Sequence, residues 1–395
     1  MELPFELRTA IEEMLEGQKP EQLKKVSAEI TRRYKNESGR DGHMISSDLE
    51  AKVYAAVRMP ATYGAVRSAL SYVFECICSD CWVNSAKYDE LDLRCEPEDV
   101  SASPVMGKTI PIRSVFDIGA GSGAATWAVY DALDSFDQSS PVQITCFERE
   151  AAMRKIGEDL MKADPGLSAS AQWKKFDLLT DSLPAKADLV VSSYVLNELT
   201  SSARGAAIAK LWEATEGILL IVEPGTKEGF AVISEIREKL LAAGASLVAP
   251  CPHDGPCPIA PGSSEVNRAA SAKKAEVTRA TSAVADDPKN EETDDWCHFA
   301  CRVARTRLHK QLKDADVPYE DEKYSYIAFA RIPQDSPLTI SRASSRVLRH
   351  PYITKGQIDL TLCTPNGIEK TTVRKRDGDT FKRAKKCKQG DSFTY

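Results

Sequence analysis

Hydrophobic positions follow three patterns along the chain. Up to about residue 105 they recur at the spacing of an amphipathic helix. Short apolar runs then alternate with helical stretches as far as residue 250, and strand-like runs return after residue 296. Residues 262–294 contain almost no large apolar side chain, and we expect a mobile insertion there. We therefore predict a helical N-terminal region (1–108), an α/β core (109–250) and a C-terminal module (251–395).

The middle region has the alternation of a mostly parallel, doubly wound sheet. Strands are predicted at Ser114–Ile118, Val142–Phe147, Leu189–Ser192, Gly217–Val222 and Ser246–Ala249. Helices are predicted at Ala124–Leu133, Ala151–Met161, Ser202–Ala214 and Ala231–Ala243. In the N-terminal region, Pro60 is expected to begin a new helix or to kink the existing one. In the tail, strands are predicted at Tyr324–Ala330 and Gln357–Cys363, and Lys370–Arg376 is expected to pair with the latter across an Asn-Gly turn.

A glycine-rich loop lies between the first strand and the first helix of the core. Its glycines, Gly119, Gly121 and Gly123, allow a tight turn and close approach of a ligand to the helix N-terminus. Glu148 ends the next strand, where an acid can bind ribose hydroxyls. Asp177 falls where a third strand of this fold would end, ahead of the fourth at Leu189–Ser192, and there it can meet adenine. Asp117 beside the loop disfavours a pyrophosphate and favours a cationic methionine group. Together these features resemble the class I S-adenosylmethionine-dependent methyltransferase fold, with an NAD-type fold as the alternative.

The fourth predicted strand ends at the edge where this fold holds the acceptor. Asn197 and Glu198 follow it, and either could orient an acceptor or cap the next helix. Asn197 is therefore a candidate catalytic residue by position alone.

Cysteines in stiff or exposed contexts suggest a metal site. Cys251 and Cys257 lie in a loop with four prolines, which holds ligands in place before a metal arrives. Cys297 follows the insertion, and Cys363 ends a predicted strand. Four thiolates could hold an iron–sulfur cluster or a tetrahedral zinc ion. Cys301 competes with Cys363 as the fourth ligand, and His253 or His298 could serve in a zinc site. We expect the core to contain three further cysteines, Cys76, Cys78 and Cys81.

Composition narrows the class of protein. The chain has 395 residues, of which 42% are hydrophobic and 28% charged, which excludes a wholly disordered chain. No apolar run approaches the roughly 18–20 residues that cross a bilayer, so we expect no membrane association. The first twenty residues resemble neither a secretory signal nor an acid-poor transit peptide. Eleven cysteines in such a chain indicate thiols or metal ligands before disulfides.

Motifs spread along most of the chain resemble one family, the methyltransferase-like mitochondrial small-ribosomal-subunit factors and their bacterial relatives. The most specific are the proline-flanked cysteine loop and a Trp-Cys-His-Phe element. The full set comprises Arg58–Tyr63, Asp117–Gly123, Val222–Thr226, Cys251–Pro258, Trp296–Phe299, Tyr319–Tyr326 and Lys375–Gly378.

This resemblance implies an S-adenosylmethionine site and a [4Fe–4S] cluster, with zinc as the alternative. By position, Cys251, Cys257, Cys297 and Cys363 match the cluster ligands. It also implies association with small-subunit rRNA during assembly, with rRNA as the methyl acceptor if the protein is an enzyme. The competing hypothesis is a zinc-stabilised methyltransferase of a protein or small molecule. We expect a monomer in the mitochondrial matrix if a transit peptide has been removed, and otherwise in the cytoplasm.

Basic residues support the RNA hypothesis independently. Nine crowd the last thirty residues with few acids between them, and phosphate binding requires such clusters. They are Lys370, Arg374, Lys375, Arg376, Lys382, Arg383, Lys385, Lys386 and Lys388. A second basic stretch, from Arg302 to Lys310, is expected at helical spacing.

Overall fold

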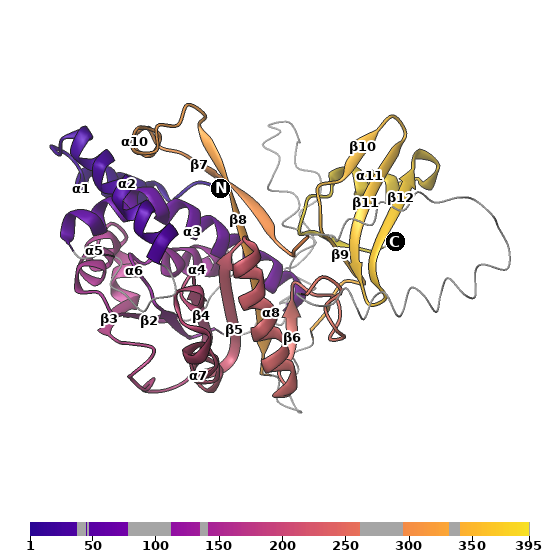
Figure 1. Cartoon of the computed structure of the whole chain (residues 1–395), viewed down its shortest axis with the longest axis horizontal. Helices are drawn as coiled ribbons and strands as arrows, with labels where there is room; N and C mark the ends of the chain where they lie inside the picture. The colour runs from indigo at the N-terminus through magenta and orange to yellow at the C-terminus, as the bar shows by residue number, and fades with distance from the viewer. Residues whose placement is uncertain are drawn as a thin grey trace, which may run out of the picture.

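The computed structural model describes residues 1–37, 45, 47–77, 112–134, 141–260, 295–331 and 340–394 (Figure 1). The predicted insertion at 262–294 lies outside the described residues. A large sheet forms the centre of the molecule, with strand order β3-β2-β1-β4-β5-β8-β6 and β7 paired to β8. Its strands are β1 (Ser114–Ile118), β2 (Gln143–Glu148), β3 (Ala171–Lys175), β4 (Ala187–Ser193), β5 (Thr215–Pro224), β6 (Ser246–Ala249), β7 (Phe299–Ala304) and β8 (Tyr319–Ala330).

The sheet has the strand order of class I methyltransferases. Strands β1 to β5 are joined in parallel, whereas β8 runs antiparallel to both β5 and β6. The central strands β1, β4 and β5 are buried along most of their length because helices cover both faces, as their continuous apolar runs require. The predicted α/β, Rossmann-like class is therefore confirmed.

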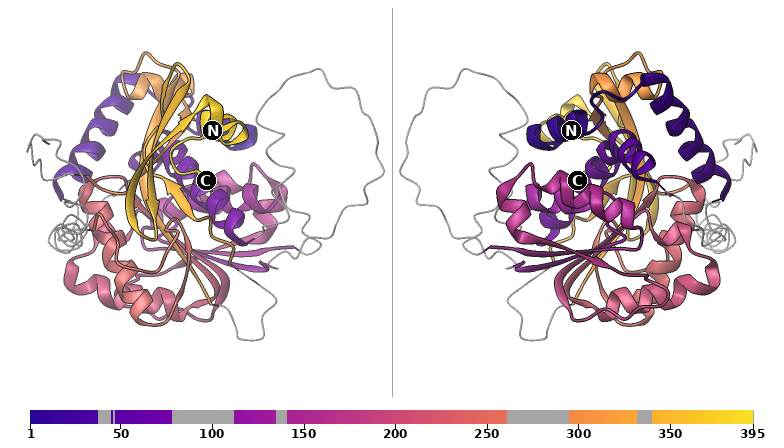
Figure 2. Two further views of the ribbon diagram at one scale, coloured as in Figure 1. Left: turned by 90° about the vertical axis from the view of Figure 1, so that its right-hand side faces the viewer. Right: turned by 90° about the vertical axis from the view of Figure 1, so that its left-hand side faces the viewer.

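Helices form a layer on each side of this sheet (Figure 2). The N-terminal helices pack with α4 and α5 into one hydrophobic core, whereas α7 and α8 enclose a second core on the opposite face. The helices are α1 (Phe5–Met14), α2 (Pro20–Glu37), α3 (Asp48–Ile77), α4 (Ala124–Asp134), α5 (Ala151–Met161), α6 (Pro165–Ser170), α7 (Ser201–Glu213), α8 (Lys227–Ala242) and α10 (Arg307–Leu312).

Helix α3 bears on the prediction for Pro60, which allowed either a new helix or a kink in the existing one. The chain continues through Pro60 as a single helix of 30 residues, so the first alternative, a new helix, is wrong. Most of its residues are buried, and its apolar side chains face α4 and several strands, so tertiary packing outweighs the lost backbone hydrogen bond. Cys76 near its end is buried, as expected of a core residue; Cys78 and Cys81 lie outside the described residues.

A smaller sheet lies beside the large one (Figure 1). Its strands run in the order β10-β11-β9-β13, with β12 paired to β11. The predicted hairpin is present, because β11 and β12 pair antiparallel up to Thr364 and Gly367. Helix α11 packs on this hairpin around a small apolar core that includes Ile358 and Val373. The elements are β9 (Ser345–Val347), β10 (Tyr352–Thr354), β11 (Gln357–Thr364), β12 (Gly367–Arg374), α11 (Asp379–Lys386) and β13 (Ser392–Phe393).

Strand β8 belongs to the large sheet although it comes late in the chain. It lies in the segment expected to form the C-terminal module, yet it inserts between β5 and β6 of the large sheet. The cysteine loop, the insertion and β7 thus fall between β6 and β8 in the sequence. This topology brings residues 251–260 and 295–298 to the boundary between the two sheets.

Candidate functional site

The glycine loop joins β1 to α4 and has a backbone that favours glycine. Gly119, Gly121 and Gly123 all have positive φ angles, of 72°, 57° and 88°. At Gly119 a Cβ atom would also lie only 2.4 Å from Cγ2 of Val195, so a larger residue is excluded by both conformation and space.

Glu148 braces this loop from the end of β2. Its Oε2 accepts a hydrogen bond from the N–H of Gly121 (2.9 Å), and its Oε1 accepts one from the N–H of Glu150 (2.7 Å). Burial raises the pKa of the Glu148 carboxyl, and the two backbone donors oppose that shift.

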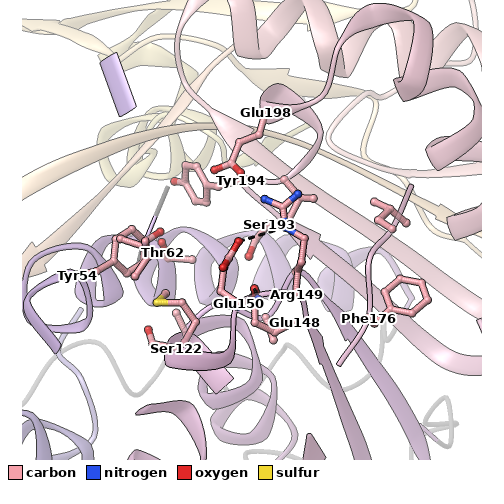
Figure 3. A pocket seen from close by; sticks show the side chains of 18 of the residues that line it. Tyr54, Thr62, Ser122, Glu148, Arg149, Glu150, Phe176, Ser193, Tyr194 and Glu198 are labelled. Carbon is pink, nitrogen blue, oxygen red and sulfur yellow. Dashed lines mark hydrogen bonds and ion pairs between the residues drawn. The ribbon is translucent and has the colours of Figure 1, made fainter. Parts of the chain in front are cut away.

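A cavity of about 150 Å³ opens above the loop (Figure 3). Gly119, Gly121, Glu148 and Asp177 all line it, as predicted for a cofactor site. Its lining carboxylates are Glu148, Glu150, Asp177 and Glu198, against the single guanidinium of Arg149. An excess of negative charge around a cavity favours a cationic ligand.

Two predicted cofactor residues lie behind the loop, outside the cavity lining. Asp117 is buried; its Oδ2 accepts a hydrogen bond from Oγ1 of Thr126 (2.7 Å), and its Oδ1 has no partner within the part of the chain that the structure describes. Burial raises the pKa of Asp117 to about 6. At Gly123, a Cβ atom would lie 2.9 Å from Cε of Met161. These residues shape the loop from the core side.

Asn197 lies in the short 3₁₀ helix η2 (Leu196–Glu198), which follows β4. With its amide oriented to suit its neighbours, it donates to Oε2 of Glu223 (2.8 Å) and to the carbonyl oxygen of Tyr194 (3.2 Å). The N–H of Leu196 donates to the other oxygen of Glu223 (2.9 Å). Asn197 therefore fastens the turn to the end of β5, and the residue that caps α7 is Thr200.

Helix α3 supplies a wall of the cavity that the sequence did not predict. Tyr54, Met59 and Thr62 line it together with Tyr194 and Glu198, which follow β4. Figure 3 shows Tyr54 and Thr62 on the same side of the pocket as Tyr194. Burial, with the Glu148 carboxylate second, raises the pKa of Glu198 to about 7. The only sequence signal for this wall is the Arg58–Tyr63 motif.

The four predicted metal ligands come together at the boundary of the two sheets. Cys251 and Cys257 lie after β6, Cys297 precedes β7, and Cys363 lies in β11, and all four line one cavity of about 30 Å³. Burial raises the pKa of Cys297, and the thiols of the other three add to this effect. Burial likewise raises the pKa of Cys363 to about 12 and of Cys257 to about 11, again reinforced by Cys251. The thiols are therefore electrostatic neighbours.

The other candidate ligands differ in position. Cys301 is buried in β7 against α3, where the pKa of its thiol responds to Glu322 and Asp321 rather than to the cavity cysteines. Nδ1 of His298 lies 3.1 Å from the carbonyl oxygen of Trp296. His253 is close to the cavity, with Nε2 3.7 Å from Sγ of Cys363. Across the described ranges, no group of three or more His, Cys, Asp or Glu side chains is arranged so that it could hold a metal ion.

The basic residues of the tail are exposed on β12, α11 and the turns beside them. Of the nine, Arg376 and Lys382 form ion pairs, each with a nearby aspartate. The second basic stretch is different from the prediction: Arg302 lies in β7 and is paired with Asp321, and Arg305 is paired with Glu320. His309 is buried. Helical spacing fails there because the helix begins only at Arg307.

Comparisons with known proteins agree with this arrangement. The sequence matches the family described as mitochondrial small ribosomal subunit Rsm22 over residues 108–292 and 282–394. It is 32% identical over 163 residues to the human mitochondrial ribosome assembly protein METTL17, covering 37% of this chain and 34% of that protein. It is 22% identical over 383 residues to Rsm22-cox11 tandem protein 2 of Schizosaccharomyces pombe, a mitochondrial protein, covering 91% and 44%. The chain thus spans less than half the length of either relative.

Two solved structures with some similarity to this chain are methyltransferases. One is the magnesium protoporphyrin IX methyltransferase of Synechocystis PCC 6803 with bound S-adenosylmethionine, at 11% identity and a TM-score of 0.35, covering 82% of this chain and 97% of that one. Another is the glycopeptide N-methyltransferase MtfA, at 21% identity and a TM-score of 0.24, covering 28% and 46%. Strand order, and not these low scores, identifies the fold.

Proposed function

Because this chain belongs to the family described as mitochondrial small ribosomal subunit Rsm22, we propose that it is an assembly factor of the mitochondrial small ribosomal subunit. In this proposal it binds S-adenosylmethionine in the core, carries a [4Fe–4S] cluster on four cysteines and contacts rRNA. The observation that carries the proposal is that Cys251, Cys257, Cys297 and Cys363, from separate segments, line one cavity.

The pocket above the glycine loop suits S-adenosylmethionine by the charge of its lining and by the predicted residues that line it. Gly119 and Gly121 would hold the methionine part, Glu148 the ribose and Asp177 the adenine. The negative lining of the cavity favours a cationic ligand over a pyrophosphate. When bound, this cofactor supplies a methyl group activated by a sulfonium. If the protein is an enzyme, we assign Asn197 to positioning the β4 turn through Glu223.

The cysteine cavity fits a four-thiolate group by its donor set. All four side chains are soft thiols, which suit iron–sulfur clusters and zinc alike. Burial raises the pKa of the Cys257, Cys297 and Cys363 thiols, and a bound cation would replace their protons. Loading must then draw the sulfur atoms into ligand geometry.

The basic surface on β12 and α11 is the proposed RNA contact. Lys385 and Lys386 are exposed in the last turn of α11, and Arg374 is exposed at the end of β12. Replacement of Lys382, Arg383, Lys385 and Lys386 by Gln should weaken rRNA binding and reduce its salt dependence, because phosphate contacts release counterions. A gel-shift titration at several salt concentrations measures both. Arg302→Gln is the control, since Arg302 is already paired with Asp321.

Metal analysis of protein purified without oxygen tests the cluster. We expect about four iron and four sulfide per chain and a broad absorption band near ~400 nm. A colourless protein with one zinc ion would contradict the cluster and favour the competing hypothesis, a zinc-stabilised methyltransferase of a protein or small molecule.

Cofactor binding is tested by calorimetry with Gly121→Arg, which places a long side chain at the cavity lining. We expect binding to be lost. Transfer of a labelled methyl group to small subunits then distinguishes an enzyme from a binding factor. If the protein is an enzyme, the wild type transfers the label and Gly121→Arg does not. If it is a binding factor, the wild type transfers no label and Gly121→Arg still binds RNA.

A further inference from the structure

Two buried arginines share the cysteine cavity. Arg237 of α8 and Arg346 of β9 are 5% and 3% exposed, and both line the cavity with the four cysteines. Buried guanidinium groups are rare unless a negative charge compensates them, because burial removes their hydration. Among the residues that the structure describes, neither forms an ion pair with a carboxylate.

Backbone carbonyls take up their hydrogen bonds instead. Nη2 of Arg237 donates to the carbonyl oxygens of His253 (3.0 Å) and Gly255 (2.6 Å), within the cysteine loop. Its Nε is buried and has no partner among the described residues. Arg346 donates from Nε to Pro250 O (2.9 Å) and from Nη1 to Gly390 O (2.9 Å). Its Nη2 lies 3.9 Å from Sγ of Cys76, and its guanidinium lies 5.5 Å from the centre of the Tyr72 ring. Both arginines therefore hold the loop, and both bring full positive charges that carbonyls only partly offset.

The arginines at the rim of the same region are different. Arg342 forms a two-pronged pair with Asp254 (2.7 and 2.9 Å), and Arg349 pairs with Asp295. Their charges are therefore balanced locally. Within the described residues, Arg237 and Arg346 are the charged groups of the cavity lining that form no ion pair with a carboxylate, although Glu75 and Asp391 act on Arg346 from a greater distance.

A bound four-thiolate group would supply the negative charge that these two arginines lack. Four thiolates around a zinc ion, or around a cubane core of two positive charges, leave two negative charges. We propose that Arg237 and Arg346 are charge-compensating residues that neutralise a four-thiolate group in this cavity. Two negative charges match the two guanidinium groups. Three cysteines with His253 would leave only one negative charge, so one guanidinium would stay unbalanced, and the charge count therefore favours four cysteines. The inference rests on the proposed function, because it requires the cavity to bind a metal or cluster.

The test compares charge with hydrogen bonding in the full chain. Arg237→Gln and Arg346→Gln remove the charge, whereas Arg237→Lys and Arg346→Lys keep it but lose the forked donor geometry. The probes are Zn²⁺ alone and iron with sulfide under anaerobic conditions, with metal affinity measured against a competing chelator. We expect the Gln variants to lose about 10- to 100-fold in affinity, as for other residues that support metal ligands, and the Lys variants to lose less.

Two further readouts do not depend on any activity. The rise in melting temperature on metal loading should be smaller in the Gln variants, because the metal-free wild type has uncompensated buried charge. In the iron–sulfur form, the reduction potential should shift to a lower value, because reduction adds a negative charge that the missing guanidinium no longer stabilises. The control, Arg342→Gln with Asp254→Asn, removes a balanced pair and should leave both readouts unchanged.

The outcomes separate the two proposals. If the wild type binds metal and the Gln variants bind it as tightly, charge compensation is wrong and the cluster proposal stands. If the Lys variants lose as much as the Gln variants, the arginines act through hydrogen bonds to the loop, which also overturns the inference. If the wild type binds neither probe, the cluster proposal fails and this inference fails with it. Should Arg346→Gln not fold, Arg237→Gln carries the comparison.

Discussion

At the scale of single residues, Gly119 meets two separate demands. Its φ of 72° disfavours any side chain, and Cγ2 of Val195 lies 2.4 Å from where a Cβ would be. Gly244 also has a positive φ, of 79°, but open space around it. We therefore expect Gly119→Ala to lower the free energy of unfolding by roughly 2–3 kcal/mol, and Gly244→Ala by about 1 kcal/mol, the strain alone. Urea denaturation measures both.

A second substitution isolates the steric part. Val195→Ala in the Gly119→Ala background removes the clashing methyl groups, so the two changes together should cost less than the sum of each alone. Additive effects would mean that backbone strain accounts for the whole loss, contrary to the close contact.

At the scale of elements, the sequence predicted most of the core. Ser114–Ile118, Ala151–Met161 and Ser246–Ala249 have the predicted bounds, because period and flanking turn residues act locally. The place of β8 could not be predicted, since its pairing with β5 depends on contacts about a hundred residues apart. Tyr54 and Thr62 of the cavity wall were missed for the same reason: their role arises only when α3 packs over the glycine loop.

Glu223 shows how one element is fastened to another. Burial raises the pKa of this carboxyl to about 8, so the folded state keeps a proton that the unfolded state releases above about 4.5. The free energy of unfolding should therefore fall as the pH rises from about 5 to 8, by up to about 1.4 kcal/mol per pH unit from this group. Glu223→Gln should flatten that slope, as measured by denaturation at several pH values. Glu238→Gln, on an exposed part of α8, is the control, and an unchanged slope in Glu223→Gln would refute the assignment.

At the scale of the whole molecule, the predicted family is confirmed over most of the chain. The relatives are named as mitochondrial proteins. None of the helices in the described ranges is long and apolar enough to span a bilayer. The meeting of four cysteines from both sheets in one cavity has a consequence for stability. Cys251 and Cys257 belong to the large sheet's loop, whereas Cys363 belongs to the small sheet.

A metal or cluster on these cysteines would therefore link the two sheets. Removing it with a chelator, or by Cys363→Ser, should release β9 to β13 while leaving β1 to β5 intact, because the large sheet has its own two cores. Hydrogen exchange followed by mass spectrometry should show faster exchange in 345–393 than in 114–224 after removal. Cys387→Ser is the matched control, since Cys387 packs beside the small core outside the cavity. Equal protection of both sheets with and without metal would mean that apolar packing alone, and no link through Cys363, joins them.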